Sequence, residues 1–289
     1  MSDRHPIRVG ISACLLGQEV RYDGGHKRDR FLTDTFGQFV EWVPVCPEVE
    51  AGFGTPRDAM RLVESDGHIR LLTIKTAVDL TDRLTRWADR RVEQLEGEQL
   101  SGYVLKKDSP SCGLERVKVY RPHGMSERRG RGLFAAGLHE RFPHLPLEEE
   151  GRLSDPRIRE NFIERVFAYR RLQDLFAGRW TVGTLVQFHT AHKLTLMAHS
   201  IAAYQQLGRL VAGAKRRSRP VVEREYVDGF MSALEVIATP RRHTNVLQHM
   251  AGYFKDALDA SAKRELQATI EDYRLGLVPL VVPLTLIRH

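Results

Sequence analysis

The sequence contains very little cysteine and no long apolar run. Only three cysteines occur among 289 residues, they are widely spaced, and the first six residues lack the pattern of a secretory signal. A disulfide framework is therefore not expected, and a reducing cytoplasm is the expected location. No apolar segment approaches the ~20 residues needed to cross a bilayer, so we expect no membrane partner.

Internal repeats and low-complexity segments are also absent, but charge is distributed unevenly. The net charge is +7, and it divides into −1 for residues 1–150 and +8 for residues 151–289. This asymmetry predicts two domains with different partners. The basic residues Lys215, Arg216, Arg217, Arg219, Arg241 and Arg242 lie near expected helix ends. They suit RNA or DNA phosphates, although a solvated basic surface is the commoner explanation of such residues.

The first half alternates short β-rich runs with helical stretches. Strands are expected at 7–13, 42–45, 69–74 and 102–106, and helices at about 30–40, 80–96 and 131–142. This alternation predicts an α/β domain with a mostly parallel sheet over residues 1–142. Ligands bind beyond the carboxyl ends of the strands in such sheets.

The second half has a different character. Residues 143–153 contain two prolines and an acidic run, and they are the predicted linker. Ser154-Asp155-Pro156 is a typical helix start. The periodicity then predicts helices at 154–176, from about 181 to 212, and at 221–238, 240–258 and 261–275. Residues 154–289 are therefore predicted to form an all-α domain.

The three cysteines share one local context. Each follows an apolar run that is an expected strand, and Cys46 and Cys112 have a proline or glycine beside them. Parallel strands would bring all three thiols to one edge of the sheet. This arrangement fits a zinc site, although the close C-x-x-C pairs of structural zinc do not occur. It also fits a nucleophilic or redox cysteine, an iron–sulfur cluster with one open iron, or three buried free cysteines.

Five motifs narrow this choice. They are Ile11–Gly17, Val20–Gly24, Cys46-Pro47-Glu48, Thr55-Pro56-Arg57 and Ser109–Gly113. Together and in this order they resemble the thiouracil desulfurase family over residues 6–140. The resemblance implies a 4Fe–4S cluster held by Cys14, Cys46 and Cys112. Its fourth iron would take the sulfur of a thiolated pyrimidine base or nucleoside, the C=S group would become C=O, and sulfide would leave without redox change.

The same resemblance implies the other site residues. Glu48 and Ser109 are the catalytic acid–base candidates. Substrate binding is assigned to Ser12, Arg21, Tyr22, Asp23, Lys106 and Ser111. Phe53-Gly54 departs from the Gly-Leu-Pro-Thr-Pro-Arg pattern of the family at an expected pocket wall. An alternative function is a nucleic-acid or modified-RNA binding protein with a structural or sensory cluster.

Several of these residues also have structural explanations. Glu48 is placed to cap a helix or to pair with Arg57. Ser109 precedes a proline and suits a turn that binds its own backbone. Asp23 precedes two glycines, which is itself a turn signal. Lys106 is explained equally by a solvated strand end.

The helical half contains His189, His192 and His199 in one stretch. Their spacing permits a metal site, but without a carboxylate partner we expect histidines that bond between helices. The segments 188–193, 245–250 and 283–286 resemble the bacterial YbgA-type domain over residues 150–289. Such chains usually continue further, so the sequence is expected to be truncated at its C-terminus.

Overall fold

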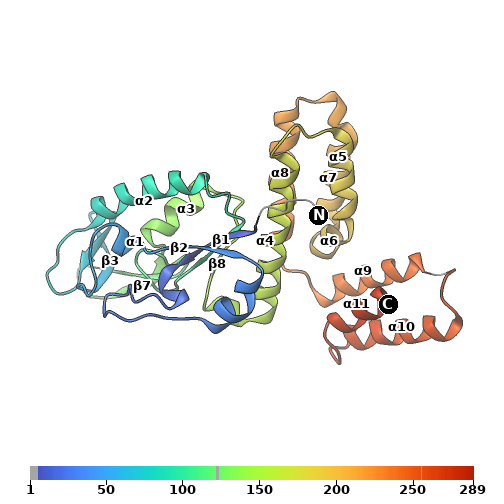
Figure 1. Ribbon diagram of the computed structural model, residues 1–289, viewed down its shortest axis with the longest axis horizontal. Helices are drawn as coiled ribbons and strands as arrows, with labels where there is room; N and C mark the ends of the chain where they lie inside the picture. The colour runs from blue at the N-terminus through green and yellow to red at the C-terminus, as the bar shows by residue number, and fades with distance from the viewer. Residues whose placement is uncertain (1–5, 122–123, 255) are drawn as a thin grey trace. The chain divides into compact units, whose positions relative to one another are not determined.

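The computed structural model describes residues 6–121, 124–254 and 256–289. The chain divides into two compact units, Met1–Arg170 and Arg171–His289. Among the described residues, no helix is long and apolar enough to cross a membrane. Figure 1 follows the chain from the α/β unit in blue and green to the helical unit in yellow and red.

Sheet A forms the centre of the first unit. Its strands run in the order β2 (Glu41–Val45), β1 (Arg8–Ser12), β5 (Gly102–Leu105) and β8 (Leu147–Glu149), and every neighbouring pair is parallel. Ser12 is in register with Val45, and Leu105 with Glu149. The carboxyl ends of all four strands therefore meet at one edge.

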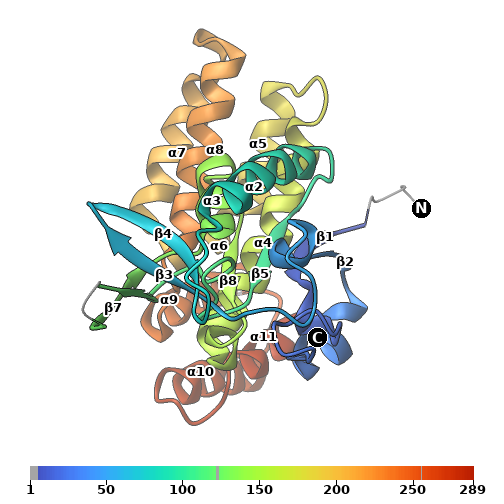
Figure 2. The same ribbon diagram turned by 90° about the vertical axis from the view of Figure 1, so that its left-hand side faces the viewer.

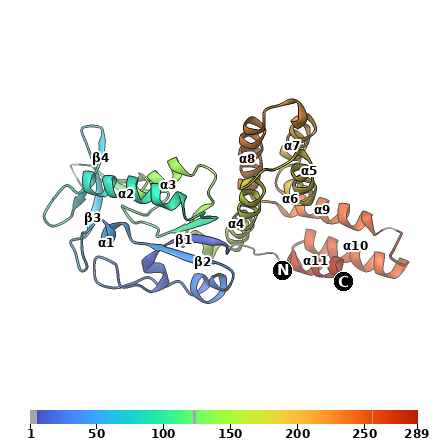
Figure 3. The same cartoon turned by 45° about the horizontal axis from the view of Figure 1, so that its top comes forward.

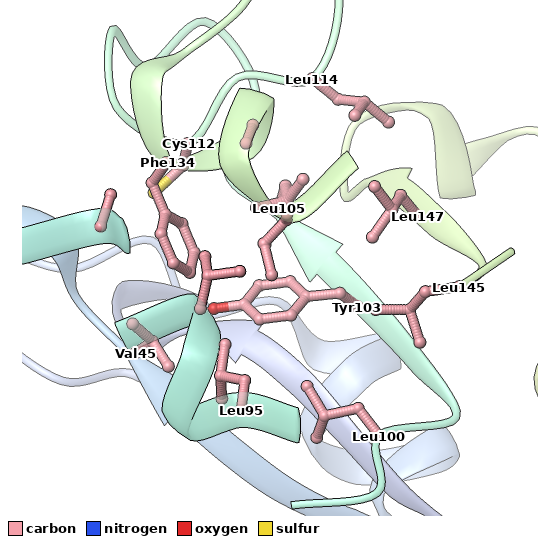
Figure 4. Close-up of a cluster of buried hydrophobic side chains, with 14 of the residues drawn as sticks. Val45, Leu95, Leu100, Tyr103, Leu105, Cys112, Leu114, Phe134, Leu145 and Leu147 are labelled. Carbon is pink, nitrogen blue, oxygen red and sulfur yellow. The ribbon is translucent and has the colours of Figure 1, made fainter. Parts of the chain in front are cut away.

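One face of sheet A is covered by α2 (Thr81–Glu96) and α3 (Leu133–Arg141), which lie side by side in Figures 1 and 3. Tyr103 is completely buried in this layer and meets Phe134 edge-on, with ring centroids 5.8 Å apart. Figure 4 shows its ring among Leu95, Leu105 and Phe134, with the Cys112 sulfur close to Phe134. The third cysteine is therefore anchored by the same apolar core that joins the helices to the sheet.

The opposite face of sheet A packs against a second apolar cluster. Val9, Ile11 and Val104 contribute strand side chains, and α4 (Pro156–Phe176) contributes Phe162 and Val166. These five side chains are buried, with exposed fractions of 1% or less. Since adjacent residues of β1 and β5 point to opposite faces, burial on both sides explains their continuous apolar sequence.

A second sheet extends the first unit. Sheet B has the order β4 (His68–Thr73), β3 (Met60–Ser65), β6 (Val117–Tyr120) and β7 (Ser126–Gly130). β3–β4 and β6–β7 are antiparallel pairs, while β3 and β6 are parallel. Figure 2 shows the β3–β4 hairpin in cyan above β7 in green.

The second unit is helical. After the end of α4 it contains α5 (Val182–Ala191), α6 (Lys193–His199), α7 (Ile201–Gly213), α8 (Arg219–Glu235), α9 (Pro240–Tyr253), α10 (Ala260–Arg274) and α11 (Val281–Arg288). In Figure 3, α5, α7 and α8 lie beside one another, and α9–α11 form a second group. The apolar faces of α9 and α10 build the core of that group.

The predicted fold class is confirmed: a parallel sheet lies in an α/β unit, and helices form the rest. The helix predicted at about 30–40 is present as a π-helix at Phe31–Thr35 followed by a 3-10 helix at Phe36–Gln38, rather than as one α-helix. The single helix predicted from about 181 to 212 is divided at His192 and Ser200. Ser200 is extended and its hydroxyl accepts the N–H of Ala203, which starts a new helix.

The predicted domain boundaries remain a prediction about independent folding. The structure divides into compact units between Arg170 and Arg171, within α4. The stretch predicted as a linker, 143–153, includes β8, which hydrogen-bonds to β5 as the last strand of sheet A. Its apolar side chains Leu145 and Leu147 are buried in the core beside Tyr103.

Candidate functional site

Each cysteine lies just beyond the carboxyl end of a sheet A strand. Cys14 follows β1 in a 3-10 turn (Ala13–Leu16), and Cys46 follows β2 and precedes α1 (Pro47–Glu50). Cys112 lies in the loop after β5. Because these three strands are adjacent and parallel, the thiols come to one edge of the sheet.

The loop of Cys112 is held by the start of α3. Phe134 and Ala135 donate their backbone N–H groups to the carbonyl of Ser111, at 3.0 and 3.2 Å. Gly132 precedes the helix so closely that a Cβ atom there would lie 2.4 Å from the Ser111 carbonyl carbon. Only glycine fits at this contact without a shift of the cysteine loop.

The three thiols line a single cavity of about 340 Å³. Its other lining residues include Ser12, Arg21, Tyr22, Glu48, Arg57, Lys106, Ser109, Val20 and Met60. The structure therefore brings together at one cavity the three predicted ligands, both predicted catalytic residues and four of the six predicted substrate-binding residues.

Burial keeps the thiols protonated in the free protein. It raises the pKa of Cys14 to about 11, an effect that the nearby Lys106 charge partly offsets. It also raises the pKa of Cys46, and that of Cys112 more strongly. A thiolate in this cavity consequently requires a positive partner, and a metal centre that displaces the protons is such a partner.

The three thiols come from three separate turns around the cavity. Within residues 6–121, 124–254 and 256–289, no three His, Cys, Asp or Glu side chains are placed to bind a single metal ion. In an iron–sulfur cluster each thiolate binds a different iron, so thiols on separate turns around a cavity fit that donor set.

Glu48 is held on both carboxylate oxygens. Its Oε2 accepts hydrogen bonds from Nε of Arg57, at 2.9 Å, and from Nη2 of the same side chain. Its Oε1 accepts the hydroxyl proton of Ser111, which is completely buried. A carboxylate has about four acceptor positions, so one position on Oε1 is left for a molecule in the cavity.

Ser109 is oriented as a donor. Its Oγ accepts the backbone N–H groups of Ser111 and Cys112 at 3.2 and 3.1 Å, which is the turn geometry expected from the sequence. Both lone pairs of the hydroxyl are then engaged. Its proton remains for the cavity or for the Ser111 hydroxyl, 3.3 Å away. Ser111 thus links Ser109 to Glu48 and does not itself line the cavity.

Lys106 is bound from two directions. Its backbone N–H donates to Ser12 Oγ at 3.0 Å, and its ammonium donates to the Lys107 carbonyl and to Glu150. The other carboxylate oxygen of Glu150 accepts the Lys107 N–H at 2.7 Å. The Lys106 side chain is 16% exposed, so its charge is fixed at the cavity wall.

Of the three predicted substrate-binding residues at 21–23, two line the cavity and one does not. Arg21 and Tyr22 line the cavity, and the Arg21 guanidinium lies over the Tyr22 ring at 5.6 Å. Asp23 lies outside the lining and accepts the Gly25 N–H at 3.1 Å. That hydrogen bond lowers the pKa of Asp23. Asp23 therefore has the turn function that its glycine neighbours indicated.

Two residues of the site were not predicted to act there. Arg57 appeared only within a motif and as an alternative partner of Glu48, and Glu150 lay in the predicted linker. The only sequence signal for Glu150 is that the acidic run 148–150 directly follows the short apolar segment 145–147, as a carboxylate at the end of a short strand would. In contrast, Phe53 and Gly54 do not line the cavity, and Phe53 packs beneath Arg83 in a separate apolar cluster.

The buried histidines of the second unit bond within the protein. His189 Nδ1 lies 3.2 Å from the Tyr226 hydroxyl, His192 Nδ1 is 2.9 Å from the Phe188 carbonyl, and His199 Nδ1 is 2.6 Å from the Val236 carbonyl. His189 and His199 connect helical segments as expected. Of the basic residues, Arg217 pairs with Glu225, and Arg241 and Arg242 line a hollow of about 750 Å³.

Comparison with known proteins finds matches in both halves. A family model described as 2-thiouracil desulfurase matches residues 9–150, and one described as a protein of unknown function (DUF1722) matches residues 193–289. The uncharacterized protein YbgA of Escherichia coli (strain K12) is 35% identical over 134 residues, which are 46% of this chain and 79% of YbgA.

Two further proteins are similar. The uncharacterized protein YbbK of Bacillus subtilis (strain 168) is 29% identical over 108 residues, 36% of this chain and 71% of YbbK. A solved structure titled [4Fe-4S]-dependent thiouracil desulfidase TudS is 30% identical and has a TM-score of 0.42, covering 51% of this chain and 93% of that chain.

Proposed function

Since the chain belongs to the YbgA family and joins a 2-thiouracil desulfurase domain to a DUF1722 domain, we propose that it desulfurates a thiolated pyrimidine base or nucleoside. Water replaces sulfur at the thiocarbonyl carbon, so that C=S becomes C=O and hydrogen sulfide leaves. No electrons are transferred in this reaction. The cofactor proposed is a 4Fe–4S cluster held by Cys14, Cys46 and Cys112.

The observation that carries the proposal is the shared cavity of three thiols and one carboxylate. The sequence has no fourth cysteine, so such a cluster would keep one iron without a thiolate from this chain. When bound, it supplies a Lewis-acidic iron that takes a soft sulfur ligand. The chain's own residues must then bring water to the thiocarbonyl carbon and move its protons.

Glu48 is the proposed base. Its Oε1 keeps one acceptor position beside the Ser111 bond, Glu48 lines the same cavity as the thiols, and its side chain is 14% exposed. A water bound there loses its proton to the carboxylate as it attacks carbon. The Arg57 and Ser111 donors fix the carboxylate, so the base is in place before the substrate arrives.

Ser109 and Lys106 complete the proposed site. The Ser109 proton can be donated to the ring nitrogen or to the departing sulfur, because its oxygen is already saturated by two N–H groups. Lys106 places a positive charge beside Cys14, where negative charge accumulates on thiolates and released sulfide. Arg21, Tyr22 and Ser12 are proposed to bind the polar groups of the pyrimidine.

The test is anaerobic reconstitution with iron and sulfide, followed by incubation with 2-thiouracil, 4-thiouracil and thiolated nucleosides. Loss of the thione absorbance and release of sulfide measure turnover. Glu48→Gln should keep its iron and lose about 10²–10⁴ in rate, the usual effect of removing a general base. Single Cys14→Ala, Cys46→Ala and Cys112→Ala variants should each lose iron.

Two results would count against the proposal. If the reconstituted protein were inert on every thione tested, the desulfurase function would be rejected. The alternative, a binding protein with a structural or sensory cluster, would then be favoured. A cysteine variant with wild-type iron content and spectrum would remove that residue from the ligand set. RNA or DNA contact by the basic second half stays a separate prediction. If such contact occurs, the measured affinity should fall steeply as the salt concentration rises.

A further inference from the structure

We propose that Arg57 is a positioning residue, which acts by holding Glu48 with one carboxylate oxygen turned to the cavity. The inference rests on the proposed function, in which Glu48 is the base. Neither the family match nor the relatives assign Arg57 a role. Its side chain is only 6% exposed, which is unusual for an arginine unless its donors are satisfied by the protein.

The donors of Arg57 are distributed over a carboxylate, two backbone carbonyls and a hydroxyl. Nε and Nη2 both bind Oε2 of Glu48. Nη1 reaches the carbonyls of Val20 and Gly54 at 3.0 and 2.8 Å, and Thr55 Oγ1 at 3.3 Å. Four of the five N–H groups of the guanidinium are therefore used by acceptors within the protein, and only the second N–H of Nη2 is left over by these bonds.

This distribution fixes the orientation of the carboxylate. Because both bonds from Arg57 end on Oε2, that oxygen is used up by the guanidinium. Oε1 is left to Ser111 and to the cavity. The planar fork of arginine can bind Oε2 twice and reach the loop carbonyls in the same orientation, whereas the ammonium of lysine is a single point of charge.

Arg57 also connects Glu48 to the wall that carries one thiol. The Val20 carbonyl that accepts from Nη1 is also the contact of Cys46 Sγ, at 3.7 Å. The backbone N–H of Arg57 donates to the Tyr22 carbonyl at 2.9 Å. The base, the turn 20–22 and the loop 54–57 are therefore set in one arrangement by one side chain.

The experiment is a double-mutant cycle on the reconstituted full chain, with kcat and KM measured on the best thione and iron counted per chain. Arg57→Ala should lower kcat on the order of 10²-fold, the cost of misplacing a reacting group, with little change in KM. Arg57→Lys should recover only part of the rate. In the Glu48→Gln background, Arg57→Ala should cost far less than in the wild type, because the residue it positions is already gone.

Arg83→Ala is the matched control. Arg83 donates to the carbonyls of Ala51 and Gly52, at 2.9 and 2.8 Å, in the loop that precedes Gly54, and it is not among the residues that line the cavity. It should leave kcat near the wild-type value. Iron content supplies the readout that does not depend on turnover: Arg57→Ala should retain its iron.

Three results would overturn the inference while leaving the proposed function standing. If the fold losses in kcat from Arg57→Ala and Glu48→Gln multiplied in the double variant, Arg57 would act independently of Glu48. A rise in KM with unchanged kcat would make it a substrate contact. If the iron content of Arg57→Ala fell in proportion to its activity, Arg57 would support the cysteine ligands rather than position Glu48. An inert wild type would instead overturn the proposed function and the Arg57 role with it.

Discussion

Lys106 and Glu150, which are 44 positions apart in the sequence, form a mostly buried ion pair at the edge of sheet A. β5 ends just before Lys106 and β8 ends just before Glu150, and the two strands pair in parallel. The pair therefore joins the ends of two strands at the edge that carries the thiols. It also holds the loop that leads to Cys112, because Glu150 accepts the Lys107 N–H.

Glu150→Gln should destabilise this edge. The amide keeps one acceptor but places an NH₂ group against either the partly buried Lys106 ammonium or the Lys107 N–H, so one of these donors loses its partner. We expect a loss of about 1–3 kcal/mol in the free energy of unfolding, measured by urea denaturation of the apoprotein. A lower iron content should accompany it.

The control for Glu150→Gln is Glu271→Gln in the second unit. Glu271 pairs with Arg274 on the surface of α10, where both side chains are about half exposed. An exposed pair of this kind contributes little to stability, because water and salt screen its charges. Equal losses for the two variants would mean that the Lys106–Glu150 pair is no more than a surface contact.

The sequence predicted the thiol edge correctly because the signals are local. Cys14, Cys46 and Cys112 each follow an apolar run whose length suits a buried strand, and parallel strands necessarily collect their ends at one edge. Glu150 could not be found in this way. Its role depends on β8, a strand of three residues whose pairing with β5 is set by the fold of the whole unit.

Of the four strands of sheet B, only β4 was predicted from the sequence. The strand β7 shows why local sequence is not enough. The charged run Ser126–Gly130 forms β7, an edge strand with exposed side chains, and lacks the apolar alternation that marks a half-buried strand. Likewise, α11 was not predicted, because Pro279 precedes the apolar segment from which it forms and Pro283 lies within that segment. Pairing and packing, rather than local preference, decide these elements.

Gly132→Ala should disturb the Cys112 loop. The added Cβ would lie 2.4–2.8 Å from backbone atoms of Ser111 and Cys112, and backbone cannot move aside without moving the cysteine. We expect a lower melting temperature and less iron per chain after reconstitution. Overpacking of this kind typically costs about 1–3 kcal/mol.

Gly137→Ala in the same helix is the matched control. Its Cβ would meet only Val92 Cγ2, at an ordinary 3.7 Å. Alanine favours a helix interior over glycine by up to about 1 kcal/mol, so this variant should be as stable as the wild type or more so. If Gly132→Ala behaves like Gly137→Ala, the close approach of α3 to the cysteine loop does not constrain the site.

The stability of the chain should fall on acidification through His189. His189 as a whole is 8% exposed, and its ring stacks on Tyr204 with centroids 5.3 Å apart and bonds to the Tyr226 hydroxyl. Burial lowers its pKa below the ordinary value, and the neighbouring His192 lowers it further. The folded state thus favours the neutral ring.

The sign of the effect follows from proton binding. An unfolded histidine titrates near pH ~6.5, whereas folded His189 titrates lower, so the unfolded chain binds more protons between these two values. The stabilisation from the neutral ring is fully present above about pH 6.5 and is lost as the pH falls through the folded pKa.

His189→Gln removes the titrating group while keeping a polar side chain. Melting temperatures measured at pH 7.5 and 5.5 should therefore drop less for His189→Gln than for the wild type, and equal drops would show that His189 does not carry this acid sensitivity.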